Sequence, residues 1–168
     1  MSGPRTLVVM RHAKAEPYAD ADRDRRLTAR GRTDATAAGR QLDAWGLRPD
    51  HVLVSAAART VETWELVKQA LDCGPVEEIS EALYTASARE VVERVREVPD
   101  EHRTVAVVGH NPVASYLATI LHDNAGEPDA IRGLLAGFPP AAFAVLELDA
   151  GWEALGEGTA RLVRFHTP

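Results

Sequence analysis

Short runs of apolar and β-branched residues alternate along the chain with longer stretches whose apolar positions recur every three or four residues. The length and β-branching of the runs predict strands, whereas the recurring positions predict helices. Strand and helix alternate through most of the chain, as is typical of a mostly parallel sheet with helices on both faces. We therefore predict an α/β fold with an antiparallel element late in the chain. The predicted strands are 6–10, 51–55, 76–79 (a weak one), 104–108, 142–148 and 161–165.

Four stretches predict helices from their apolar spacing and their end signals. The first is capped by Thr28, the second spans 57–71, and the third opens with a capping box formed by Ser87 and Glu90. The fourth follows 111–112. The expected inward positions are Ala35, Ala38, Leu42 and Trp45; Val61, Trp64, Val67 and Leu71; Val91, Val92, Val95 and Val98; and Val113, Leu117, Ile120 and Leu121.

The region around the fourth helix is rich in asparagine, proline and glycine. We expect Asn111 to cap the helix and Pro112 to occupy its first position, where no backbone N–H is needed. Residues 122–140 contain three Gly and three Pro, which predict a long loop or a loop with one helical turn. The last two strands are expected to be joined across a Gly-containing turn.

Chain length, net charge and cysteine content argue against several classes of protein. The 168 residues are the length of one ordinary domain, so we take 1–168 as a single domain. The net charge of −6 argues against non-specific binding to nucleic acid or anionic membranes. No apolar run approaches the ~20 residues of a membrane helix, and the N-terminus does not have the pattern of a signal peptide. Cys73 is the only cysteine, which excludes an internal disulfide and favours the cytoplasm.

The candidate chemistry lies directly after the predicted strands. His12, preceded by Arg11, follows the first strand, and His110 follows a later one. Arg59 lies in the first turn of the helix after the second strand. The carboxyl ends of parallel strands meet at one edge of a sheet, where helix N-termini favour anions. Arginine is disfavoured at a helix N-terminus by the helix dipole, and a bound anion supplies a reason for it. The pattern therefore indicates a phosphate site.

A metal site is the rival use for two histidines. However, no third and fourth ligands occur at a recognisable spacing, and Cys73 is isolated. The alternating aspartates of 20–24 are spaced as in a calcium loop, but the required glycine is Arg25 and the bidentate glutamate is Gly31. We predict neither a metal ion nor a cofactor. The remaining histidines, which lack matching partners and are expected to be structural, are His51, His102, His122 and His166.

These motifs together resemble the histidine phosphatase superfamily. That family carries Arg-His-Gly after its first strand, Ser-Pro-x-x-Arg-Ala-x-x-Thr after the second, and another His after a later strand. The corresponding segments here are 11–13, 55–63 and 109–112. Residues 24–31 are similar to the Arg-Pro-Leu-Thr-x-x-Gly segment of its small bacterial branch, the SixA-type phosphohistidine phosphatases. Ala13 and Ala56 replace the usual Gly and Pro, and neither replacement removes a catalytic side chain.

The resemblance implies a phosphoglycerate mutase-like fold and a metal-independent phosphatase. His12 would be the nucleophile that becomes a phosphohistidine and is then hydrolysed. Arg11 and Arg59 would clamp the phosphoryl oxygens, and Arg25, from a polar loop, would add a third clamp. His110 would donate a hydrogen bond to a phosphoryl oxygen. The catalytic acid of larger family members has one candidate by position here, Glu81.

The stretch between Arg59 and His110 is filled by the predicted helices and the weak strand, which leaves no room for a large insertion over the site. An open site suits a phosphohistidine in a protein better than a mutase intermediate, which must be kept from water. The alternatives are a phosphatase or mutase for small phosphate esters, and a phosphate-binding module without catalysis. A binder needs no nucleophile at His12, which argues against the module. We expect no nucleic-acid or membrane partner, and a monomer.

Overall fold

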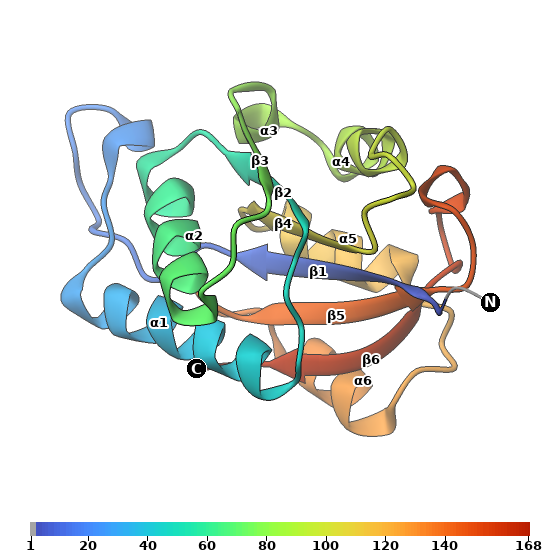
Figure 1. Ribbon diagram of the computed structural model, residues 1–168. Helices are drawn as coiled ribbons and strands as arrows, with labels where there is room; N and C mark the ends of the chain where they lie inside the picture. The colour runs from blue at the N-terminus through green and yellow to red at the C-terminus, as the bar shows by residue number, and fades with distance from the viewer. Residues whose placement is uncertain (1–2) are drawn as a thin grey trace.

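The computed structural model describes residues 3–168, and its centre is a six-stranded sheet in the order β3-β2-β4-β1-β5-β6 (Figure 1). The first four strands are parallel to one another, β5 is antiparallel to β1, and β6 is antiparallel to β5. The predicted α/β fold with a late antiparallel element is therefore confirmed. The strands are β1 (Arg5–Arg11), β2 (His51–Ser55), β3 (Val76–Ser80), β4 (Thr104–Gly109), β5 (Phe143–Leu148) and β6 (Arg161–His166).

Helices cover both faces of this sheet. In Figure 1, α1 and α2 lie against one face, and α4, α5 and α6 lie against the other. The longer helices are α1 (Ala29–Ala44), α2 (Ala58–Leu71), α4 (Ala88–Arg96), α5 (Val113–Leu121) and α6 (Pro128–Ala136). The short elements are α3 (Ala82–Thr85) and the 3-10 helices η1 (Asp22–Asp24) and η2 (Trp152–Ala154).

The central strand β1 is a continuous apolar run because both of its faces are buried. Leu7 and Val9 pack in the core under α4 and α5, whereas Val8 and Met10 pack in the core under α1 and α2. Each of these side chains is at most 2% exposed. Burying one such side chain contributes about 1.5–3 kcal/mol, so β1 is held from both faces. This packing therefore fixes the backbone position of the residues just beyond the carboxyl end of β1.

The prediction for residues 122–140 was wrong, because this region contains the nine-residue helix α6. Pro128 lies in its first turn and Leu134 faces the core. Gly133 lets α6 approach β6 closely, since a Cβ there would lie 2.7 Å from Cδ1 of Phe165. Three of the six Gly and Pro residues that suggested a loop thus serve α6: Pro128 at its start, Gly133 at the close contact and Gly137 at its end.

The helix after Asn111 begins one residue later than predicted. Pro112 is the N-cap residue of α5 rather than its first helical residue. Asn111 Oδ1 accepts a hydrogen bond from the backbone N–H of Ser115 at 3.2 Å, so it still satisfies one N–H of the first turn. The connection between β5 and β6 also holds more than a turn, because η2 places a fully buried Trp152 in the core.

Gly31 offers a test of how the loop after His12 is held. A Cβ at Gly31 would lie 2.0 Å from the carbonyl oxygen of Lys14, which also accepts the N–H of Thr28 at 2.9 Å. Alanine is the better helix former by about 1 kcal/mol, but overpacking costs about 1–3 kcal/mol. Because the clash is with backbone rather than with a flexible side chain, the cost lies in the upper part of that range, and we expect Gly31→Ala to lower the free energy of unfolding by about 1–2 kcal/mol in urea denaturation. Gly74→Ala, where a Cβ meets nothing within 4 Å, is the control; equal stability of both variants would contradict the contact.

Candidate active site

Four side chains singled out from the sequence gather at the carboxyl ends of β1, β2 and β4. The pairing of β1 with β4 sets Arg11 opposite Gly109, and the N–H of His12 donates to the carbonyl of Gly109 at 3.0 Å. The rings of His12 and His110 are 5.5 Å apart between centroids. Arg59 joins them from the first turn of α2, close enough for its charge to act on both histidines.

His12 has the environment of a neutral nucleophile. Its Nδ1 lies 2.7 Å from the carbonyl oxygen of Ala13, and because a carbonyl only accepts, the hydrogen belongs on Nδ1. Nε2, which makes no hydrogen bond to residues 3–168, then carries the free lone pair. Burial of the ring, which is 8% exposed, together with the nearby cations, lowers the pKa of His12 to about 3. The imidazole is therefore neutral and able to attack at pH 7.

His110 is arranged to present a hydrogen to a ligand. Its Nε2 lies 2.7 Å from Oγ of the fully buried Ser55. Burial, followed by the charge of Arg59, lowers the pKa of His110 to about 4, so the ring is neutral. When the hydroxyl of Ser55 donates to Nε2, the ring hydrogen lies on Nδ1. Within the described part of the chain, this Nδ1–H has no partner and almost no exposed surface, so a bound oxyanion reaches it only by displacing neighbouring side chains.

Arg11 is oriented by a backbone carbonyl from the far end of the chain. Its Nη1 donates to the carbonyl oxygen of Phe138 at 3.1 Å, and Nδ2 of Asn111 donates to the same oxygen at 2.9 Å. Phe138 follows α6, and its ring packs edge to face on Phe165 at 5.2 Å. The helix that the sequence analysis missed therefore fixes the acceptor that orients Arg11. A weak sequence signal exists, because Pro128 and Gly137 mark the two ends of α6.

Arg59 is paired with a carboxylate that the sequence analysis did not assign to the site. Its Nη1 donates to the carbonyl oxygen of Asp22 at 2.9 Å, and its Nη2 donates to Oδ2 of Asp22 at 3.1 Å. Tyr84 donates its hydroxyl to the same Oδ2, and Arg25 donates to Oδ1 at 3.0 Å. The hydrogen bond from Tyr84 and the charge of Arg59 lower the pKa of Asp22 to about 2, so this group is a carboxylate at pH 7.

Two buried threonines of α2 fix the connections around the site, Thr63 to the residue after His12 and Thr60 to the end of β2. Oγ1 of Thr63 accepts the N–H of Ala13 at 2.9 Å and donates to the carbonyl of Arg59 at 2.6 Å. Oγ1 of Thr60 donates to the carbonyl of Ser55 at 2.7 Å. Both belong to the 55–63 motif, so that motif supplies positioning hydrogen bonds as well as an arginine.

The two remaining predicted residues lie farther from the histidines. Arg25 donates to Asp22 and, through Nε, to the carbonyl of Glu16 at 2.7 Å, so it reaches Arg59 only through Asp22. Glu81 is the N-cap residue of α3, and its side chain is 65% exposed and paired with Arg23 of η1. The third-clamp role of Arg25 and the acid role of Glu81 stay predictions.

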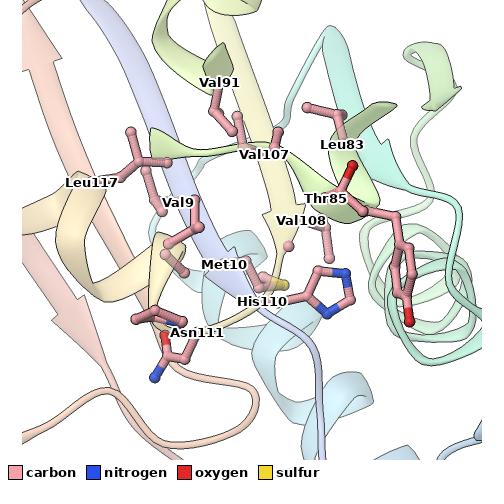
Figure 2. Close-up of a pocket in the computed structure, with 16 residues that line it drawn as sticks. Val9, Met10, Leu83, Thr85, Val91, Val107, Val108, His110, Asn111 and Leu117 are labelled. Carbon is pink, nitrogen blue, oxygen red and sulfur yellow. The ribbon is translucent and has the colours of Figure 1, made fainter. Parts of the chain in front are cut away.

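An apolar cavity of about 240 Å³ lies beside His110, beneath the residues around α3. Figure 2 shows His110 and Asn111 at one end of this cavity and Leu83, Val91 and Leu117 at the other. The site thus combines a rim of arginine and histidine donors with an apolar hollow.

Other features of residues 3–168 concern two alternatives, a metal site and a membrane-spanning helix. No group of three or more His, Cys, Asp or Glu side chains there is placed to hold a metal ion. None of the helices in that range is long and apolar enough to cross a bilayer. The rings of His51 and His102 contact each other in a tilted arrangement, 4.8 Å apart between centroids, near the amino ends of β2 and β4 and away from the site.

Comparison with known proteins agrees with this geometry. The family profile described as Histidine phosphatase superfamily (branch 1) matches residues 7–84. An uncharacterised protein of Mycobacterium tuberculosis is 38% identical over 161 residues, which is 95% of this chain and 99% of that protein. A solved structure assigned as the phosphohistidine phosphatase SixA of Nakamurella multipartitia is 34% identical, with a TM-score of 0.86 over 99% of this chain and 98% of that one. Its counterpart from Agrobacterium tumefaciens is 28% identical, with a TM-score of 0.80 over 99% and 100% of the two chains.

The buried neutral state of His12 predicts a pH dependence of stability. Its folded pKa of about 3 lies below the usual 6.5, so the unfolded chain binds more protons between these values. The free energy of unfolding therefore falls as the pH drops below 6.5, by about 2 kcal/mol from His12 alone at pH 5. We expect His12→Asn, which can keep a donor near Nδ1 but does not titrate, to lose that much less stability between pH 7.5 and 5 in urea denaturation. An unchanged pH dependence would contradict a buried neutral His12.

Proposed function

Because this chain belongs to the histidine phosphatase superfamily, we propose that it removes the phosphoryl group from phosphohistidine in a protein, through a covalent intermediate on His12. The observation that carries the proposal is the pairing of two neutral histidines between two arginines. Among residues 3–168, neither Nε2 of His12 nor Nδ1 of His110 has a hydrogen-bond partner. One ring can attack a phosphorus atom while the other donates to its oxygen.

The residues divide the reaction between them. Nε2 of His12 attacks phosphorus, a new P–N bond forms, and the bond to the leaving group breaks in line with it. Arg11 and Arg59 hold the phosphoryl oxygens and offset the charge that develops in the transition state. Nδ1–H of His110 donates to another oxygen. Water then hydrolyses the phosphohistidine and regenerates His12. Since the arginines supply the positive charge, the scheme needs no metal ion or cofactor.

The leaving group favours phosphohistidine over an alkyl ester. An alkoxide is strongly basic and needs a proton donor in the transition state, whereas a phosphohistidine whose other ring nitrogen is protonated expels neutral imidazole, the conjugate base of an acid with a pKa of about 6.5. The one candidate acid, Glu81, lies on an exposed helix start and is paired with Arg23. Because Glu81 is exposed and paired with Arg23, the site suits a substrate whose leaving group departs without help from a strong general acid. A phosphatase or mutase for small esters is the second candidate, supported by the apolar cavity beside His110.

We further propose a role for Arg25, together with an oligomeric state, a compartment and a partner for the protein. Arg25 would join the clamp once it is released from Asp22. The chain would act as a single histidine phosphatase domain, as a monomer in the cytoplasm, on a phosphorylated protein partner. The relatives from Nakamurella and Agrobacterium, which are similar along nearly their whole length and are assigned as phosphohistidine phosphatases, support the phosphorylated protein as the partner.

A trapping experiment tests the covalent intermediate. Phosphohistidine is labile in acid, so turnover should be quenched in alkali and the intact protein weighed by mass spectrometry. We expect wild type to carry one phosphoryl group on His12 and His12→Ala to carry none. Turnover of His12→Ala should fall by roughly a thousandfold or more, since the nucleophile is lost.

His122→Ala, at a histidine outside the site, is the matched control and should keep both the trapped phosphoryl group and the turnover. Retained turnover in a folded His12→Ala variant would contradict the mechanism through a covalent intermediate on His12. Adding a chelator should change nothing; activity lost on chelation and restored by a divalent ion would contradict the metal-free scheme.

The role of Glu81 is decided by comparing leaving groups. If Glu81 is the general acid, Glu81→Gln should slow alkyl phosphates by at least about tenfold. It should slow phosphohistidine and activated aryl phosphates far less, because an activated aryl oxide leaves as a weakly basic anion and the phosphohistidine ring can take a proton from water on its other nitrogen. An equal loss on all substrates would instead assign Glu81 to positioning. No loss on any substrate would leave it a surface residue that pairs with Arg23.

A further inference from the structure

The terminal nitrogens that Arg59 would offer to a phosphoryl group are already in use. Nη1 and Nη2 donate to the carbonyl oxygen and to the carboxylate of Asp22, at 2.9 and 3.1 Å. A carboxylate and a phosphoryl group both present paired oxygens to a guanidinium fork. Asp22 supplies one backbone oxygen and one carboxylate oxygen, and these occupy the same two nitrogens of Arg59 that a phosphoryl group is expected to use.

Asp22 also lies on the solvent side of Arg59. The side chain of Asp22 is 53% exposed, whereas that of Arg59 is 8% exposed. Besides Arg59, the carboxylate is held by the hydroxyl of Tyr84 and by Nη1 of Arg25. These contacts come from α3 and from the residue after η1, so the carboxylate links three parts of the chain at the edge of the site.

The loop that carries Asp22 is fixed at its base. Ala15 and Leu27 form an antiparallel bridge, and the N–H of Glu16 donates to the carbonyl of Arg26 at 2.7 Å. The N–H of Leu27 donates to Glu62 of α2 at 2.9 Å. The tip, η1, is exposed and carries no buried residue. The tip can therefore shift while the base stays in place, because the apolar anchor lies at Leu27.

We propose that Asp22 is an internal ligand of Arg59 that competes with the phosphoryl group and so sets the affinity of the site for phosphate. The proposal rests on the proposed function, in which Arg59 is part of the phosphoryl clamp. A phosphoryl dianion carries more charge than a carboxylate, so it displaces Asp22 when it binds. After hydrolysis, Asp22 returns to Arg59 and helps expel the product. The site thereby avoids tight retention of inorganic phosphate despite its two arginines.

Equilibrium binding of orthophosphate and tungstate, measured by calorimetry at low salt, tests this competition without requiring turnover. We expect Asp22→Asn to bind both anions about tenfold more tightly than wild type, since a charged hydrogen-bonding competitor is lost. Tyr84→Phe, which removes one hydrogen bond that holds Asp22 in place, should tighten binding about twofold to threefold. Asp24→Asn removes the same charge from the same 3-10 helix at an exposed position, and should stay within about twofold of wild type.

Each other outcome overturns the proposal. An equal gain in Asp22→Asn and Asp24→Asn would mean that only the general field of the loop matters. Weaker binding in Asp22→Asn would mean that Asp22 orients Arg59 for the anion, and unchanged binding would mean that the anion uses another edge of the guanidinium. Failure of every variant and of wild type to bind either anion would overturn the clamp itself and the proposed function with it. Urea denaturation of each variant checks that the fold is kept.

Discussion

The parallel pairing of β1 with β4 at the centre of the sheet sets Arg11 opposite Gly109 and so brings His12 and His110 to one edge. Both strands are buried on both faces, which makes this register costly to change. A slip of one residue would turn the apolar side chains of β1 to the wrong face and separate the two histidines. The geometry of the candidate site is therefore secured by hydrophobic packing several residues away from the two histidines.

Burial and charge act together at the site. Desolvation is the main cause that lowers the pKa of both His12 and His110, and the arginines add to it. In the proposed mechanism, the neutral imidazoles provide one lone pair and one N–H donor, while Arg11 and Arg59 supply the positive charge that a phosphoryl group needs. With Asp22 in place, part of that positive charge is balanced by a carboxylate. The empty site can then keep two arginines near each other without a bound anion.

The sequence predicted the strands, four of the helices and the position of Arg11, His12, Arg59 and His110, because each depends on local periodicity or on residues next to a strand end. It did not predict α6, because glycines and prolines in this region suggest a loop. Only the folded chain shows that Gly133 allows the close contact of α6 with Phe165. Nor did it assign Asp22 or the carbonyl of Phe138 to the site. These two reach the arginines across 37 and 127 residues, so only the folded chain brings them together.

The shared acceptor at Phe138 also has a consequence for biosynthesis. Arg11 leaves the ribosome long before the carbonyl that orients it has been made, since 127 residues separate the two. Asn111, which donates to the same oxygen, must wait as well. A nascent chain that has completed β1, β2 and β4 would hold both histidines while its first arginine still lacked this partner. The phosphate site is thus completed only after α6 is synthesised, which delays its assembly until the late part of translation.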